Sequence, residues 1–584
     1  MRNDANGCRF PRHSRRALLS LVLLLVFGSY LPGTAHGKDK PVVLNLALFD
    51  ANPDYTGGVF LPVRTDTAAS LAPLTSDAWS AAARPVRRAA ADGVTLLLLR
   101  AELPRGYRGP VKFRIEGSSD PGSLWRVDDR KVTDNSAAGG ARDDDPPGHK
   151  HQLSVQAVRI GNESFAFALY RAPRDFDPDG GPGTAALRER EAHVRVQLPG
   201  KPGHGETART LAIVRPLVIF IHGTWGSAAT WQNFPLWQSS ANETRNFQFD
   251  SAVTLPFAAT RVSFDDFLDA SGPVVETAQL VLPRIVAALK EWRQATGSAG
   301  TQADVITHSF GGFVTRMVAQ TQPDPDPLTP DGNHNFRAAA NWGHGLIHKL
   351  ITLAATHRGS AEANHLAYLN HFGHTPGALR ELADFFTHNP IDNGAVRDQM
   401  VLSPALRSLE ETRVPGHSIA GSGLVRLDDT TSYAASLLFL QSFDVPNGPY
   451  QSAGSVTRDG NPDWCAFNRL SNYIFNLDYN TPPLGPEPDC DLVPNYDLTV
   501  SEWSSRGLMP RSAFSNVFDI NPALVGRLNH LQLHESADVS DRIVFLLRQP
   551  TTSRYFAFFP AVMSIAPTPL EERFSTFDPA WLYE

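Results

Sequence analysis

Two patterns of hydrophobic and polar positions follow each other along the chain. From Pro41 to about Gly200, short apolar or alternating runs are separated by clusters of Gly, Pro and Asp, without sustained helical periodicity. This pattern predicts β-strands with the spacing of a sandwich, and we expect an immunoglobulin-like β-sandwich domain over residues 38–205. The predicted strands cover residues 42–49, 59–63, 94–103, 111–115, 153–160, 164–170 and 192–198.

From about Glu206, solid apolar runs alternate with stretches of helical spacing. Strands that are unbroken apolar runs are buried on both faces, which is typical of a parallel sheet covered by helices. We therefore expect a mostly parallel sheet with helices on both faces over residues 206–584. The predicted strands are 217–221, 303–306, 350–354 and 416–421, and the predicted helices are 273–292, 313–320 and 539–547.

Size and charge agree with this division. The chain has 584 residues, which is too long for one hydrophobic core, so at least two domains are expected. Its formal net charge is −7, and its Lys and Arg residues are scattered rather than clustered. Because nucleic acids are bound by basic surfaces, we expect no nucleic-acid partner.

The first residues have the pattern of an export signal. Four arginines between Arg9 and Arg16 precede an apolar run from Ala17 to Leu31, and small residues follow at 35–37. We predict that residues 1–37 form a signal peptide that is removed, so that the mature protein is periplasmic or secreted. The alternative is a retained membrane anchor, but the apolar run is shorter than the ~20 residues that a spanning helix needs.

The cysteines fit export. Cys8 lies within the predicted signal, so the mature chain keeps Cys465 and Cys490. In an oxidising compartment these two form one disulfide, with two separate buried thiols as the alternative.

One acidic loop is a candidate metal site. The run from Asp175 to Gly180 has alternating carboxylates like the start of a calcium loop, but Ala186 stands where the completing Glu would be. We therefore predict a solvated turn there, and no metal or cofactor in the protein.

A candidate nucleophile lies in the sequence Thr307-His308-Ser309-Phe310-Gly311-Gly312. A serine attacks a carbonyl only when it protrudes from a sharp turn and a base takes its proton. Such a turn, between a strand and a helix, needs small residues two positions before and after the serine. Gly311 fits this rule, and Thr307 departs from the usual Gly. We predict Ser309 as the nucleophile, the alternative being a buried serine in an ordinary turn.

The reaction also needs an oxyanion hole, because the tetrahedral intermediate carries negative charge on the former carbonyl oxygen. We expect one donor from the N–H of Phe310, and the other from Thr224, in the turn after the strand 217–221. Trp225 is a candidate wall of the substrate pocket. His222 is expected to be structural, tucked into the same turn.

An acid and a base are expected after the serine, in that order. Asp497 lies in a short turn before a strand-like run, with Asp428 and Asp429 as alternative acids. His530 and His534 both precede the terminal helix, and spacing alone does not separate them. The acid orients the imidazole, which accepts the serine proton and returns it to the leaving group.

Here the chain resembles the bacterial lipase and esterase branch of the α/β-hydrolase superfamily, over about residues 215–547. In that branch the base begins a run of the form His-x-x-Leu-x-x-Ser/Asp-x-x-Val, which is matched by His530, Leu533, Ser536 and Val539. The resemblance therefore implies His530 as the base.

Two further stretches carry the resemblance. Leu353–Ser360 resembles a Leu-x-Thr-Pro-His-x-Gly-Ser motif, with Ala355 and Thr356 in place of Thr-Pro, and Asp497 with Ser504 looks like the acid-loop motif. The resemblance implies the α/β-hydrolase fold, with insertions around 362–408 and 422–490 that serve as lids in lipases.

We therefore expect a carboxylic-ester hydrolase that acts on lipid-like or other apolar acyl esters. Its expected partners are small-molecule or lipid esters, and contact with a membrane surface or lipid interface is a further option. The same residues also suit an acyltransferase, a thioesterase or an amidase, because one fold hosts many reactions. The opposing hypothesis is a binding protein with a vestigial hydrolase domain. The sequence predicts no oligomeric state.

Overall fold

Every second residue is buried along several strands before Leu217, as the sequence pattern predicts. In β9 (Glu189–Gln197) and β4 (Pro110–Gly117), buried residues alternate with exposed or half-buried ones. Because successive side chains of a strand point to opposite faces, each of these strands buries one face. The computed structural model describes residues 43–51, 67–76, 79, 84–117, 119–129, 132, 151–178, 187–199, 206–235, 257–320, 344–360, 363, 394–400, 403–409, 411–421, 500, 502–521, 530 and 532–560.

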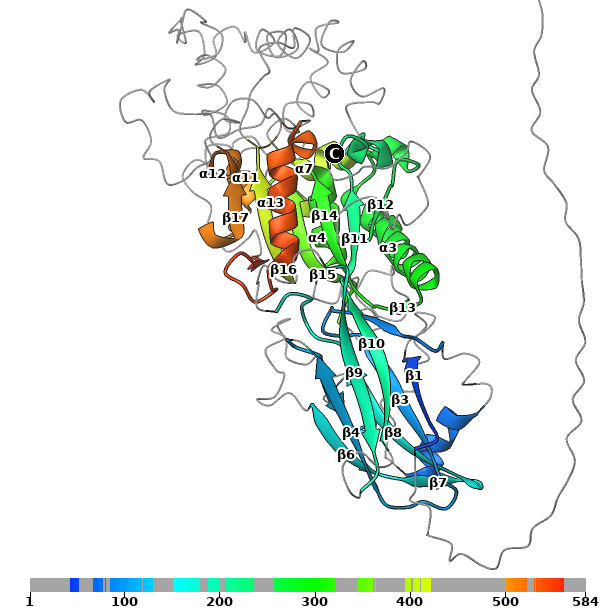
Figure 1. Ribbon diagram of the computed structural model, residues 1–584. Helices are drawn as coiled ribbons and strands as arrows, with labels where there is room; N and C mark the ends of the chain where they lie inside the picture. The colour runs from blue at the N-terminus through cyan, green and yellow to red at the C-terminus, as the bar shows by residue number, and fades with distance from the viewer. Residues whose placement is uncertain are drawn as a thin grey trace, which may run out of the picture. The chain divides into compact units, whose positions relative to one another are not determined.

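The strands before Leu217 form two sheets whose buried faces share one hydrophobic core (Figure 1). Leu99 of the first sheet and Phe113 and Val194 of the second are all buried in this core. The immunoglobulin-like topology stays a prediction. The first sheet is antiparallel throughout, in the order β1 (Asn45–Asp50), β3 (Leu96–Leu103), β8 (Glu163–Arg171) and β5 (Ser123–Trp125), with β7 (Val158–Ile160) paired to β8 and the short helix α1 (Ala68–Leu71) following β1 in the chain.

The second sheet extends past residue 205, where the first domain was predicted to end. The segment from residue 206 was expected to begin the parallel-sheet domain, but it forms a strand paired with β9 along its whole length. The change of architecture therefore falls after Val214, because the apolar side of this strand faces the first core. The order of the second sheet is β13 (Ser298–Ala299), β2 (Arg88–Ala90), β10 (Glu206–Val214), β9, β4 and β6 (Gln152–Gln156).

The parallel sheet that the sequence predicts is confirmed. Its central strands are buried along their whole length, which explains their unbroken apolar sequence. The order is β12 (Ala259–Val262), β11 (Leu217–Ile221), β14 (Ala303–His308), β15 (Ile347–Leu353), β16 (Thr412–Ala420) and β17 (Phe514–Asn516), all parallel, with β18 (Ala557–Phe559) antiparallel to β16.

Helices cover both faces of this sheet (Figure 1). Helices α3 (Val274–Thr296) and α4 (Phe310–Val318) share a core with Ile219, whereas α13 (Ala537–Arg548) shares a separate core with Val218. Because neighbouring residues of β11 point to opposite faces, α13 lies on the face opposite to α3 and α4. Shorter helices are α7 (Gly394–Gln399), α8 (Pro404–Arg407), α11 (Glu502–Arg506) and α12 (Val517–Ile520).

Part of the insertion predicted over residues 362–408 lies in the main hydrophobic core. Within the predicted insertion 362–408, Ala395 and Leu406 belong to the main core under α3, so residues 394–408 include part of the core rather than only a lid. Among the helices that the structure describes, none is long and apolar enough to cross a membrane. The predicted signal 1–37 and the predicted insertion 422–490 lie outside the described residues.

Asp92 joins the N-terminal sheets to the parallel-sheet half. Its carboxylate is fully buried and accepts the backbone N–H groups of Val94 and Thr95 on its own side of the junction. It also accepts the N–H groups of Thr301 and Gln302, between β13 and β14, at 3.0 and 3.2 Å. Together with the pairing of β13 and β2, these bonds make the junction a continuous hydrogen-bonded structure.

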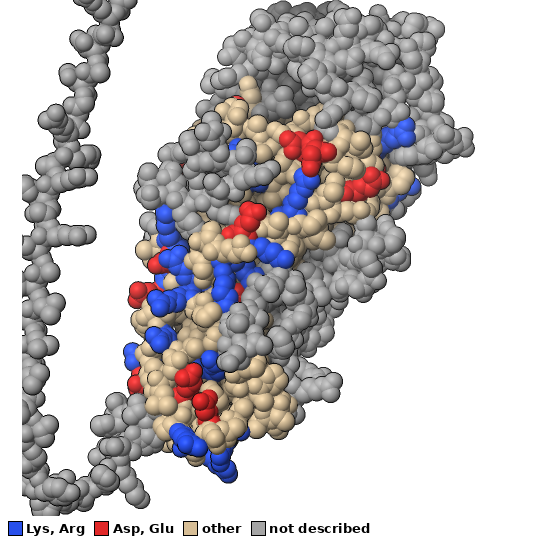
Figure 2. All heavy atoms as spheres, turned by 90° about the vertical axis from the view of Figure 1, so that its right-hand side faces the viewer, with Lys and Arg blue, Asp and Glu red and all other residues tan. Residues whose placement is uncertain are grey.

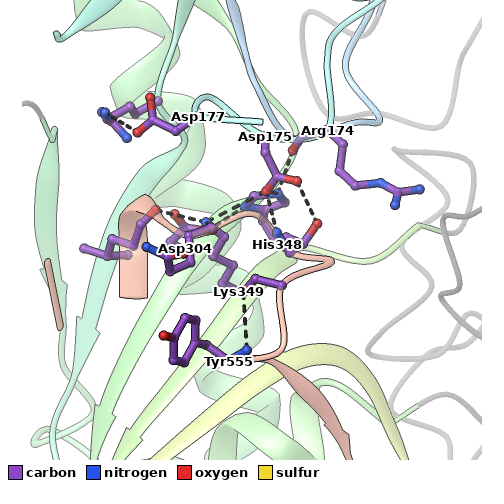
Figure 3. A network of polar contacts seen from close by, with 12 residues as sticks. Arg174, Asp175, Asp177, Asp304, His348, Lys349 and Tyr555 are labelled. Carbon is purple, nitrogen blue, oxygen red and sulfur yellow. Dashed lines mark hydrogen bonds and ion pairs between the residues drawn. The ribbon is translucent and has the colours of Figure 1, made fainter. Parts of the chain in front are cut away.

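The acidic loop at Asp175 and Asp177 belongs to the same junction, so the predicted solvated turn is wrong. Figure 3 shows Asp175 beside the side chains of His348 and Lys349 of β15. Its carboxylate accepts the N–H and hydroxyl of Thr551 at 2.9 and 3.0 Å. Asp177 forms a buried ion pair with Arg215 at 2.7 Å. Both carboxylates are partnered by side chains and backbone groups of the parallel-sheet half.

Charges of both signs are interspersed on the surface. Figure 2 shows acidic and basic side chains on one face, with most Lys and Arg over the middle of the described surface. Exposed pairs such as Arg88 with Glu189, at 3.1 Å, contribute ~0–1 kcal/mol each to stability.

Candidate functional site

Ser309 lies in a strained turn between β14 and α4. Its φ of 54° and ψ of −130° place the backbone in a region that non-glycine residues rarely adopt. The turn is held because the N–H of Ser309 donates to the carbonyl of Leu353 on β15 at 2.9 Å. Backbone strain of this kind persists only where the surrounding structure fixes it, and it gathers at functional sites.

Glycines allow the neighbouring strand to approach this turn. A Cβ on Gly311 would lie 2.3 Å from the carbonyl oxygen of His222, at the end of β11. A Cβ on Gly223 would lie 2.6 Å from Cβ and 3.2 Å from Oγ of Ser309. The turn after β11 therefore packs directly against the candidate nucleophile.

The structure also explains the departure at Thr307. Its side chain is fully buried and faces Gly312, where an added Cβ would lie 3.2 Å from its Oγ1. The threonine fits because the residue that faces it has no side chain.

His222 is held inside the turn that it begins, as predicted. It is fully buried, its Nε2 accepts the N–H of Phe264 at 3.0 Å, and its Nδ1 donates to the carbonyl of Gly223 at 2.9 Å. Burial lowers the pKa of His222 to about 4, so the ring is neutral at pH 7. This histidine shapes the turn and is not available as a base.

Of the three backbone N–H groups that follow Gly223, two donate hydrogen bonds to described residues of the protein and one does not. The N–H of Trp225 donates to the carbonyl of Ala270 at 3.2 Å, and the N–H of Gly226 donates to Gly223 at 3.1 Å. Within the part of the chain that the structure describes, the N–H of Thr224 donates to no protein group. Phe310 is the first residue of α4, where N–H groups have no partner inside the helix. Both predicted oxyanion donors thus lie beside Ser309 on the chain or in the turn that packs against it.

Trp225 lies against a small apolar group. Its half-buried indole packs on Ala363, Val396 and Met400, and its Nε1 has no hydrogen-bond partner among the described residues. The predicted pocket wall is therefore an apolar surface next to Thr224.

Three histidines gather behind the turn. His308 is buried, and its Nε2 donates to the backbone carbonyl of His530 at 2.9 Å, with ring centroids 4.7 Å apart. The centroid of the His534 ring lies 5.2 Å from that of the His308 ring. Burial lowers the pKa of His534 to about 4, and it holds the pKa of His308 well below its ordinary value. The structure thus links the backbone of His530 to the residue that precedes Ser309.

Two stretches that carry the family resemblance meet in space. The Oγ of Ser504 accepts the N–H of Arg358 at 3.2 Å and donates to the carbonyl of Gly359. Asp497, Asp428, Asp429, Cys465 and Cys490 lie outside the described residues, so the acid and the disulfide stay predictions.

Sequence reasoning missed two residues that hold the site. His308 was treated only as part of the motif, although its bond to His530 joins the two predicted catalytic segments. Gln399 had no sequence signal, because its partner Thr224 is distant in the chain, yet its Nε2 donates to Oγ1 of Thr224 at 2.9 Å.

No family model and no curated protein matches the sequence. Three of the similar solved structures are bacterial lipases and esterases. Lipase 1 from Pelosinus fermentans is 11% identical and covers 58% of this chain and 99% of its own, with a TM-score of 0.32. EstA from Clostridium botulinum is 10% identical, with coverages of 58% and 88% and a TM-score of 0.31. Staphylococcus hyicus lipase is 11% identical, with coverages of 63% and 95% and a TM-score of 0.25. Because these values are low, we base the function on the site itself.

Proposed function

We propose that the protein is an exported serine hydrolase that cleaves carboxylic esters through an acyl-enzyme on Ser309. The observation that carries this proposal is the strained turn of Ser309 between β14 and α4, with the turn after β11 packed against its side chain. A serine without a catalytic role gains nothing from a backbone conformation that costs ~1–3 kcal/mol.

In the proposed reaction, His530 takes the proton of Ser309 while Oγ attacks the carbonyl carbon of the ester. The negative charge that forms on the carbonyl oxygen is stabilised by the N–H groups of Phe310 and Thr224. Collapse of the intermediate breaks the ester C–O bond, and His530 returns the proton to the departing alcohol. Water then attacks the acyl-enzyme while His530 takes its proton. The bond between Ser309 Oγ and the acyl group breaks, the carboxylic acid leaves, and His530 returns the proton to Ser309; Asp497 is proposed to orient the imidazole.

The apolar group beside Thr224 supports an apolar acyl chain as the substrate. The half-buried indole of Trp225, which packs on the buried side chains of Val396 and Met400, offers hydrophobic contact next to the oxyanion turn. Export after cleavage of residues 1–37 and a disulfide between Cys465 and Cys490 complete the proposal.

A series of p-nitrophenyl esters from acetyl to palmitoyl, given to the purified protein, tests this function. We expect turnover that Ser309→Ala and His530→Asn each lower by ~10³-fold or more. The control Ser408→Ala removes an exposed hydroxyl at the end of α8 and keeps the wild-type rate. Equal turnover by Ser309→Ala would exclude Ser309 as nucleophile. Absence of wild-type turnover on any ester, thioester or amide would favour a binding protein.

A further inference from the structure

Thr224 carries a second polar group, its side-chain hydroxyl, in addition to its N–H. Its side chain is half-buried, and its Oγ1 accepts the Nε2 N–H of Gln399 at 2.9 Å. A hydroxyl has one proton to donate, and this bond occupies one of its acceptor positions. The proton of the Thr224 hydroxyl must therefore point away from Gln399.

The orientation of the Gln399 amide is fixed by its other partners. Gln399 is 6% exposed, and its Nε2 also donates to the carbonyl of Ala395 at 3.1 Å. A carbonyl oxygen only accepts, so the atom facing it must be the amide nitrogen. The Oε1 accepts the hydroxyl of Thr356 at 3.2 Å, and the backbone carbonyl accepts the N–H of Ser360 at 2.7 Å. Both amide hydrogens are used, and one of them always points at Thr224.

Among the described residues, no acceptor takes the hydroxyl proton of Thr224. Thr224 directly follows Gly223, where an added Cβ would lie 3.2 Å from Oγ of Ser309, so this hydroxyl belongs to the turn that packs against the candidate nucleophile.

We infer that the Thr224 hydroxyl is a third oxyanion donor, and that Gln399 is the positioning residue that orients it. This inference rests on the proposed function, because it assigns a role in the same acyl transfer. As the ester carbonyl becomes an oxyanion, the hydroxyl bond strengthens together with those from the two N–H groups. Such a donor acts on kcat more than on KM, because it binds the transition state more tightly than the substrate.

The test compares Thr224→Val, which keeps the shape and removes the hydroxyl, with Thr224→Ser, which keeps the hydroxyl. We expect Thr224→Val to lower kcat by about 10²-fold with KM changed by less than about threefold, and Thr224→Ser to recover most of the loss. Urea unfolding midpoints confirm that the variants are folded. An unchanged kcat in Thr224→Val, with wild-type ester turnover present, would overturn the inference alone.

A double-mutant cycle separates positioning from a merely structural role of Gln399. We expect Gln399→Met to lower kcat by about tenfold in the wild-type background but by less than about twofold in the Thr224→Val background. Equal losses in both backgrounds would show that Gln399 does not act through the hydroxyl. Absence of any wild-type turnover would instead overturn the proposed function, and the inference with it.

Discussion

Replacing Asp92 with asparagine tests how the N-terminal sheets are joined to the parallel sheet. The carboxylate is fully buried, and Oδ2 accepts the N–H groups of Thr301 and Gln302 across the junction. In Asp92→Asn, an NH₂ group takes the place of one oxygen. If the NH₂ group replaces Oδ2, it faces the N–H groups of Thr301 and Gln302, which are also donors. If the NH₂ group replaces Oδ1, it faces the N–H groups of Val94 and Thr95 instead.

The magnitude follows from these contacts. Either orientation of the asparagine loses two hydrogen bonds to a charged acceptor, each worth ~1.5–3 kcal/mol. We therefore expect the free energy of unfolding to fall by about 3–6 kcal/mol. Because the orientation that replaces Oδ2 loses the bonds across the junction, we also expect the N-terminal sheets to unfold separately in that case.

The assay is urea unfolding followed by tryptophan fluorescence. The matched control is Asp128→Asn, which weakens the partly exposed pair with Arg126, 3.2 Å apart, and should cost ~0–1 kcal/mol. Wild type should unfold in a single transition, and Asp92→Asn should unfold at much lower urea or in two steps. A loss for Asp92→Asn no larger than that of the control would refute the reasoning, as would two separate transitions in the wild type.

Three further predictions follow from the site. A Gly311→Ala variant places a Cβ against the carbonyl of His222, so we expect a loss of ~1–3 kcal/mol in stability and of ester turnover; wild-type values for both would contradict the packing. His308→Leu removes the hydrogen bond to the carbonyl of His530, and we expect kcat to fall about tenfold. His308→Gln keeps a donor and should restore most of the wild-type kcat. Equal losses in the Leu and Gln variants would show that this hydrogen bond does not affect kcat. Because the pKa values of His222 and His534 are about 4 in the folded protein and ~6.5 when unfolded, unfolding takes up protons between these values. Stability should therefore fall as pH is lowered from about 6.5 towards 4, at up to ~1.4 kcal/mol per pH unit for each histidine, and a urea midpoint equal at pH 7 and pH 5 would disprove it.

Much of the architecture could be predicted from the sequence because it depends on local patterns. Unbroken apolar runs predicted β11 and β15, because strands buried on both faces are apolar throughout. Helical spacing predicted α3 and α13, because each helix buries one face. No strand was predicted over residues 206–214, whose first half is polar; only the pairing with β9 shows that this segment forms β10 of the second sheet.

The site divides in the same way. The sharp turn at Ser309 could be predicted because it imposes a short local motif. The contacts of Gln399 and Asp175 could not, because their partners lie far along the chain and only the fold brings them close. The sequence of an acidic loop predicts exposure to solvent unless the cations and hydrogen-bond donors that pair with its carboxylates in the fold are known.

The most direct test of Ser309 as the nucleophile is covalent labelling with a fluorophosphonate, which bonds to an activated serine Oγ. Digestion and mass spectrometry of the labelled protein locate the adduct. We predict one adduct, on the peptide that contains Ser309, with no labelling of Ser309→Ala and normal labelling of Ser408→Ala. An adduct on another residue, or equal labelling of Ser309→Ala, would contradict the assignment.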